Sequence, residues 1–123
     1  MLGPEHPATA TTLNNLARFL QDQGDLAAAR PLFERALAIY EKRGAGHMDT
    51  HRVRHNFATL LLASGDASQA LALGEAALAA HQKLLGPTHP WTSDSARVTA
   101  DALVALNRGE EAAALRERFG LVT

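Results

Sequence analysis

Hydrophobic residues recur along this chain at the spacing of amphipathic helices. In the first stretch, a stripe of leucine and alanine follows the order i, i+3, i+4, i+7, which places its members on one face of a helix. The stripe consists of Leu13, Leu16, Ala17 and Leu20. No segment alternates β-branched and polar residues over the length of a strand. The pattern therefore predicts an all-α chain in which the apolar stripes pack against one another.

Turn and capping residues separate these stripes. Gly24 and Gly65 can adopt the left-handed conformation that ends a helix, and Asn107 is of the residue type that most often replaces glycine there. Asp25 and Asp66 follow the two glycines and can cap the next helix. The helices expected from these signals are 7–23, 26–42, 49–64, 67–84, 90–106 and 109–119.

The sequence also contains an internal repeat of about 41 to 42 residues. The segment Leu2-Gly3-Pro4-Glu5-His6-Pro7 recurs as Leu85-Gly86-Pro87-Thr88-His89-Pro90, and a weaker copy surrounds His47. Two sets of alanines keep the same spacing, namely Ala17, Ala58 and Ala100, and Ala29, Ala70 and Ala112. Repeats of this length are typical of solenoids, in which each helix pair stacks on the next. The units expected are 2–42, 43–84 and 85–123.

Several strings in these units resemble the kinesin-light-chain type of tetratricopeptide repeat (TPR), the variant of 42 residues. They are Leu13-Asn14-Asn15-Leu16-Ala17, Gln23-Gly24-Asp25, Ala36-Leu37-Ala38-Ile39-Tyr40-Glu41-Lys42 and Leu85-Gly86-Pro87-Thr88-His89-Pro90. The resemblance covers nearly the whole chain. It implies a single domain, 1–123, folded as a right-handed α-solenoid of three stacked helix-turn-helix repeats. The last repeat is then a degenerate capping repeat.

The chain departs from that family's pattern at a few positions in the second and third units. These are Arg54, Gly74, Thr99, Arg116 and Phe119. A glycine inside a helix costs about 1 kcal/mol relative to alanine, so we expect the helix around Gly74 to be locally weaker. Pro31 removes a backbone hydrogen bond inside its helix, and we expect either a late helix start or a slight bend there.

In such a stack the first helix of each pair lines the concave side, so its polar face should form a groove. The resemblance implies that the second asparagine of the Asn-Asn-Leu-Ala string, Asn15 and its counterpart Asn56, faces an extended peptide. Val98 takes this position in the third unit. The groove residues expected are Asn14, Asn15, Arg18, Arg52, His55, Asn56, Thr59, Arg97 and Asp101, with Thr11, Gln21, Asp22 and Asp94 beside them.

The chemistry of these side chains favours a peptide ligand. An asparagine amide offers a donor and an acceptor to a peptide backbone of any sequence. The cations Arg18, Arg52 and Arg97 would select carboxylates, whereas Asp94 and Asp101 argue for mixed recognition. A non-catalytic protein-interaction module is therefore the leading hypothesis. Two alternatives stay open: the polar residues are merely solvated, or the chain self-assembles through exposed repeat ends or helix exchange.

Composition narrows the function further. Twelve basic and thirteen acidic residues leave a net charge of −1, which argues against nucleic acid as a partner. The absence of cysteine excludes disulfides and thiol chemistry. No apolar run reaches the roughly 18 residues of a membrane span, and no secretory signal is evident, so a cytoplasmic protein is expected. The richness in alanine and the preference for arginine over lysine suggest a bacterial source.

No catalytic motif stands out, and we expect neither an enzyme nor a cofactor. His47, His51 and His55 are spaced by four residues and could hold a metal, but His47 aligns with the loop histidines His6 and His89. We expect these loop histidines to make local hydrogen bonds and predict no metal site. Trp91 is expected to cover the junction between the second and third units.

Overall fold

The computed structural model describes residues 6–43 and 48–121, and within them every regular element is an α-helix. The helices are α1 (Pro7–Asp22), α2 (Leu26–Lys42), α3 (Met48–Ala63), α4 (Ala67–Leu85), α5 (Pro90–Ala105) and α6 (Gly109–Arg118). Each bound lies within one residue of the expected one. The prediction of an all-α chain with six helices is confirmed for the described ranges.

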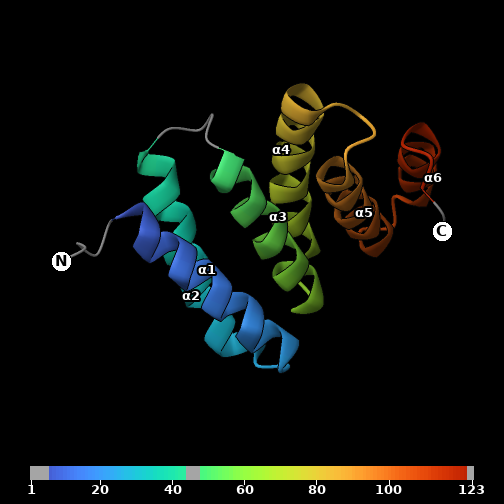
Figure 1. The fold of residues 1–123 in the computed structure, drawn as a ribbon. Helices are drawn as coiled ribbons and strands as arrows, with labels where there is room; N and C mark the ends of the chain where they lie inside the picture. The colour runs from blue at the N-terminus through green and yellow to red at the C-terminus, as the bar shows by residue number, and fades with distance from the viewer. Residues whose placement is uncertain (1–5, 44–47, 122–123) are drawn as a thin grey trace.

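The helices form three antiparallel pairs that stand in a row, α1 with α2, α3 with α4, and α5 with α6 (Figure 1). Neighbouring pairs pack through α2 against α3 and through α4 against α5. The first helices also touch, α1 with α3 and α3 with α5. This is the predicted solenoid of three stacked helix hairpins. The last helix has 10 residues, whereas α2 has 17 and α4 has 19.

The turns within the pairs follow one scheme. Gly24, Gly65 and Asn107 adopt left-handed backbone angles, with φ of 85°, 88° and 62°. The side chain of Asp25 accepts a hydrogen bond from the amide of Ala28, and Asp66 caps α4 in the same way. The glycines, the asparagine and the aspartates that predicted these turns therefore form them in the structure.

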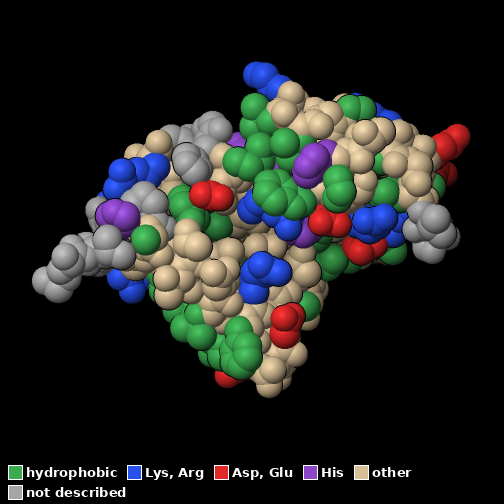
Figure 2. Space-filling view, in the orientation of Figure 1, with side chains coloured by type: hydrophobic (Ala, Val, Ile, Leu, Met, Phe, Trp, Pro, Cys, Tyr) green, Lys and Arg blue, Asp and Glu red, His purple; other side chains and the backbone are tan. Residues whose placement is uncertain are grey.

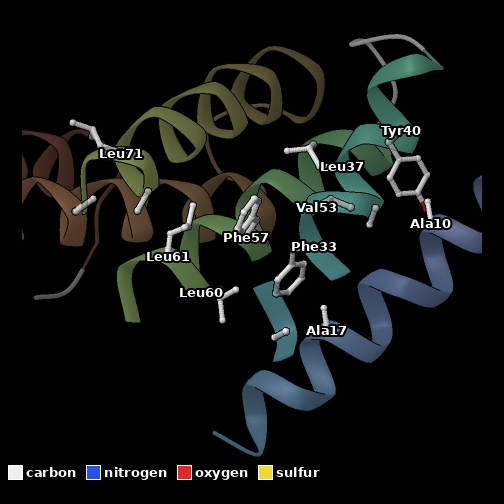
Figure 3. Close-up of a cluster of buried hydrophobic side chains, with 14 of the residues drawn as sticks. Ala10, Ala17, Phe33, Leu37, Tyr40, Val53, Phe57, Leu60, Leu61 and Leu71 are labelled. Atoms are coloured by element: carbon white, nitrogen blue, oxygen red, sulfur yellow. The ribbon is translucent and has the colours of Figure 1, made fainter. Parts of the chain in front are cut away.

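The core runs without a break along the row (Figure 3). The two sets of alanines in register are all fully buried, which brings the helix backbones close together. Phe33 of α2 stacks on Phe57 of α3, with ring centroids 5.9 Å apart, at the junction of the first and second pairs.

One expectation about this core is wrong, and of the two alternatives expected at Pro31 the late helix start is excluded. Leu16 does not belong to the buried stripe of α1, because 46% of its surface is exposed and no described helix covers that side. Pro31 does not delay the start of α2, which begins at Leu26 under the Asp25 cap. Proline is tolerated there because α2 is anchored on both sides of it, by the cap and by the buried Phe33 and Ala36.

Two of the residues that depart from the family pattern, Arg54 and Arg116, form ion pairs with a neighbouring helix. Arg54 is half-buried, forms an ion pair of 3.2 Å with Glu41 of α2 and lies 3.0 Å from Nδ1 of His51. Arg116 of α6 pairs with Asp101 of α5 at 2.7 Å. No helix in the part of the chain that the structure describes is long and apolar enough to cross a membrane.

Candidate functional site

The polar sides of α1, α3 and α5 form one face of the molecule. Figure 2 shows arginine, histidine and acidic side chains gathered over the middle of this face. A cleft of about 360 Å³ lies between α1 and α3, and its lining is Thr11, Asn14, Asn15, Arg18, Tyr40, Asp49, Arg52, Val53, Asn56 and Trp91. A second cleft of about 220 Å³ lies between α3 and α5, lined by His55, Thr59, Leu62, Asp94, Arg97, Val98 and Asp101. We call the two clefts together the groove.

The structure brings all nine expected groove residues to these two clefts. Thr11 and Asp94 also line them, whereas Gln21 and Asp22 line neither. Tyr40 was not among the expected groove residues; its ring is buried, yet its hydroxyl reaches the groove and hydrogen-bonds the hydroxyl of Thr11. The hydroxyl of a buried tyrosine still needs a hydrogen-bond partner, and this need is the feature of the sequence that could have indicated a polar neighbour for Tyr40. Asp49, Val53 and Trp91 were likewise not among the expected groove residues.

An amide pair joins α1 to α3 at the first cleft. The Nδ2 group of Asn56 donates to Oδ1 of Asn14 at 3.2 Å, and both side chains are half-buried. Repeat alignment matches Asn56 with Asn15, but Asn15 lies exposed beside the pair. Each amide has a donor and an acceptor side, so Asn14 Nδ2 and Asn56 Oδ1 keep hydrogen-bonding capacity. The third repeat has no corresponding amide, because Val98 occupies this position and is buried and apolar.

Arg52 is held in the first cleft by two groups of α5. Its guanidinium lies 4.5 Å from the centroid of the Trp91 ring, and its Nη1 is 3.9 Å from Oδ2 of Asp94. The Nη1 atom is buried and has no hydrogen-bond partner within the described residues. Burial lowers the pKa of Arg52 below its ordinary value. The cleft therefore contains an immobilised cation with an unused donor.

His55 lies next to these cations and is neutral near pH 7. Burial, and after it the charge of Arg52, lowers the pKa of His55 to about 4, while Asp94 acts in the opposite direction. The Nδ1 atom of His55 is buried and also lacks a hydrogen-bond partner among the residues described. Two buried nitrogens beside the groove, one on a cation and one on a neutral ring, thus have no hydrogen-bond partner among the residues described.

The two clefts are lined by three arginines and three aspartates, and the first cleft alone has an excess of one positive charge. Asp94 is shared between Arg52 and Arg97, which lies 3.5 Å away. Asp101 is engaged by Arg116, so its charge is compensated from α6. Arg18 is exposed and forms no ion pair within residues 6–43 and 48–121. Thr59 is exposed, and its hydroxyl donates to the carbonyl of His55 at 3.1 Å.

The histidines outside the groove have structural roles. Nδ1 of His6 accepts a hydrogen bond from the amide of Ala8, and Nδ1 of His89 accepts one from the amide of Trp91. The predicted local hydrogen bonds of the loop histidines are confirmed for these two, and His47 lies outside the described residues. Among the residues described, no three potential ligands are grouped to hold a metal ion. His51 instead faces Arg54.

Trp91 covers the junction of the second and third pairs, as expected. Its ring is 6.0 Å from that of His81 on α4 and 5.6 Å from that of His89. His81 is fully buried, and its Nδ1 lies 2.8 Å from the hydroxyl of Ser95. The side of the ring under Arg52 belongs to the groove, so one residue serves both the junction and the site.

Comparison with known proteins agrees with this architecture. One tetratricopeptide repeat family model matches residues 9–43, and a second matches residues 49–118. A solved structure of nearly identical TPR-like repeats, from a kinesin-light-chain-like protein of Podospora anserina, is 30% identical with a TM-score of 0.89. A single-substitution variant of that protein is 29% identical with a TM-score of 0.91. In both cases the match covers 97% of this chain and 57% of the other.

This chain therefore spans little more than half the length of those solved chains. A search of curated proteins finds no match. The two family models together extend over most of the described helices, and their repeats coincide with the helix pairs. The chain belongs to the tetratricopeptide repeat family.

Proposed function

We propose that this chain is a non-catalytic interaction module that binds an extended peptide or protein segment in its groove. Repeats of this family generally mediate protein–protein interaction. The observation that carries the proposal is the concentration of polar side chains around one cleft. Asn14, Asn56 and Arg52 all line the space between α1 and α3, and the Asn14–Asn56 hydrogen bond uses only one donor and one acceptor of the two amides.

The rigidity of these groups favours binding. Arg52 is clamped by Trp91, and Asn56 is fixed by Asn14, so little side-chain entropy is lost when a ligand binds. An extended backbone would exchange hydrogen bonds with the asparagine amides, and an acidic side chain would accept from Arg18 and Arg52. A small three-repeat groove is expected to bind at roughly micromolar Kd, or about −8 kcal/mol.

The test uses a fluorescein-labelled peptide of about ten residues that contains three aspartates, titrated by fluorescence anisotropy. Two matched peptides carry asparagine or lysine in place of aspartate. We expect the acidic peptide to bind at least tenfold more tightly than the other two, and more weakly at high salt. The variant Asn15→Ala/Asn56→Ala should lose at least tenfold in affinity while its helicity is retained.

Arg35→Ala provides the control, because Arg35 is exposed on α2 and lines neither cleft. It should bind the acidic peptide as the parent chain does. Equal affinity for all three peptides, or an unchanged affinity of the double asparagine variant, would overturn the groove assignment. The single-domain bounds 1–123, the bacterial source and the cytoplasmic location stay predictions of the sequence.

A further inference from the structure

The two junctions between successive helix pairs differ in one buried pair of residues. At the first junction, where α2 meets α3, Tyr40 is 3% exposed and Val53 is 1% exposed (Figure 3). One repeat later, at the second junction, where α4 meets α5, His81 and Ser95 take these places and are fully buried. Nδ1 of His81 lies 2.8 Å from the hydroxyl oxygen of Ser95. The second junction therefore buries a side chain of a type that takes up a proton near neutral pH, and the first has no such group at these positions.

The ring of His81 has no room for a second N–H group while the junction is closed. Its Nε2 atom is buried and has no hydrogen-bond partner within the residues that the structure describes. A neutral imidazole leaves one nitrogen without a proton, so the single contact through Nδ1 suits it. A protonated ring carries an N–H group on both nitrogens, and the one on Nε2 would be buried without an acceptor. The closed junction thus excludes the charged form.

The charges around His81 act in the same direction. Burial is the first cause that lowers the pKa of His81 to about 4, and the further causes are Arg52, His51, His55 and His89. In the first unit, the place of Arg52 is held by Thr11, whose hydroxyl bonds that of Tyr40. A hydroxyl partner at the first junction is therefore replaced by a cation at the second.

The carboxylates of the neighbouring helices are held by arginines. Asp94 of α5 pairs with Arg52 and with Arg97, at 3.9 Å and 3.5 Å. Glu41 of α2 pairs with Arg54, which also faces His51. A charge on His81 would therefore meet cations, and relief can come only from water.

Helix α5 is what keeps water from this ring. Ser95 contacts Nδ1, and the ring of Trp91 lies 6.0 Å from that of His81. When α5 moves away from α4, water can accept from Nε2 and screen the charge. Opening the first junction would bring no such relief and would expose the stacked rings of Phe33 and Phe57.

We propose that acid separates the third helix pair, α5 with α6, from the second pair while the first two pairs stay stacked. His81 is the responding group, because it can hold a proton only when α5 leaves α4. Each pair of a solenoid contacts only its neighbours, so an end pair can open alone. The movement also takes Trp91 and Asp94 away from Arg52, and the second cleft loses its α5 wall.

Hydrogen exchange of the full chain, resolved by helix between pH 6.5 and 4.5, tests the proposal. Exchange rates are divided by those of unfolded peptides at the same pH, so that the pH dependence of the exchange chemistry cancels. His81 has a pKa of about 4 in the closed state and about 6.5 when open, so opening of α5 should increase roughly fortyfold over this range. Exchange in α1 and α2 should change little.

Two variants remove the titrating ring. His81→Gln retains a partner for Ser95, and the increase in α5 opening should become at least about tenfold smaller. His81→Tyr/Ser95→Val places the residues of the first junction at the second, and it should lose the acid response to the same extent. The control is His6→Asn, which removes a histidine outside the junction and retains an acceptor for the amide of Ala8. It should respond as the parent chain does.

The proposal is overturned if acid raises exchange equally in α1, α2 and α5, because the whole chain would then unfold as one unit. It is also overturned if either His81 variant responds to acid like the parent chain. A His6→Asn variant that loses the response would likewise contradict it.

Discussion

Gly74 of α4 and Thr99 of α5 occupy, one repeat later, the places of the stacked pair Phe33 and Phe57. A Cβ atom added to Gly74 would lie 2.7 Å from Oγ1 of Thr99 and 3.5 Å from its Cα atom. Thr99 is 2% exposed, and its hydroxyl donates to the carbonyl of Ser95 at 2.7 Å. Each residue departs from the family pattern when considered alone. Together they let α4 and α5 approach more closely than two aromatic rings would allow.

The close contact of Gly74 with Thr99 predicts that Gly74→Ala lowers the stability of the chain. Gly74→Ala would stabilise an exposed helix by about 1 kcal/mol. Here the added methyl meets a buried hydroxyl that is fixed by its own hydrogen bond, so we expect a net destabilisation of about 1–2 kcal/mol. Urea denaturation followed by circular dichroism measures it. In Gly74→Ala/Thr99→Ala the clash is removed, and the double-mutant cycle should show a favourable coupling. Additive effects of the two changes would contradict the contact.

The contact of Arg52 with the Trp91 ring predicts that replacement by lysine is more destabilising at Arg52 than at Arg97. Lysine has no planar group to lie on the ring of Trp91, so Arg52→Lys should destabilise the chain by about 1 kcal/mol. It should also alter the emission of Trp91, which is the single tryptophan. Arg97, whose side chain is 56% exposed, serves as the control. Arg97→Lys should leave both stability and emission unchanged, and an equal effect of the two substitutions would refute the clamp.

The hydrogen bond that His89 accepts at the start of α5 predicts a contribution of this side chain to stability. Replacing His89 by alanine leaves the amide of Trp91 without its side-chain acceptor, which should cost about 1 kcal/mol of unfolding free energy. His89→Asn supplies another acceptor at the same place and should recover more than half of the loss. Both variants are compared by their urea midpoints. If asparagine were no better than alanine, the contact of His89 with the Trp91 ring, rather than the cap, would be the stabilising feature.

The buried histidine of the second junction predicts a dependence of stability on pH. Burial, with the charges of Arg52, His51, His55 and His89 around it, lowers the pKa of His81 to about 4. In the unfolded chain its pKa is about 6.5, so between these values the unfolded state binds more protons. The stability contributed by neutral His81 is complete above about pH 6.5 and is lost as the pH falls towards 4. A shift of this size corresponds to about 3 kcal/mol.

The measurement is the urea midpoint of the parent chain and of His81→Gln at several pH values between 4 and 7. Glutamine can still bond the Ser95 hydroxyl but does not titrate in this range. The variant should be less stable than the parent at pH 7 and should lose less stability on acidification. Parallel curves for the two chains would show that His81 is not the titrating group. His55, whose pKa is also about 4, adds to the slope in both.

Most of the groove could be predicted because its residues lie on helices whose faces follow from periodicity. Arg18, Arg52 and Arg97 reach the clefts for this reason. Their partners could not be predicted in the same way. Alignment pairs Asn56 with Asn15, whereas the rotation of α1 against α3 brings Asn14 into hydrogen-bonding distance instead. A shift of one residue along a helix is a rotation of about 100°, so a small change in packing decides which side chain is met.

The amino-acid sequence by itself determined the number of helices, their ends and their repetition. These depend on signals within a few residues of one another: the left-handed Gly24, Gly65 and Asn107, and the aspartate caps that follow the glycines. Helical hydrogen bonds span four residues, so local chemistry is sufficient to place them.

Only the tertiary structure decided that Gly74 compensates for Thr99, that Trp91 immobilises Arg52, and that Leu16 is exposed. Each of these depends on the distance and rotation between helices of successive pairs. That geometry results from all the contacts of the core together, because close-packed side chains must fit their neighbours jointly, and no single stretch of the chain encodes it.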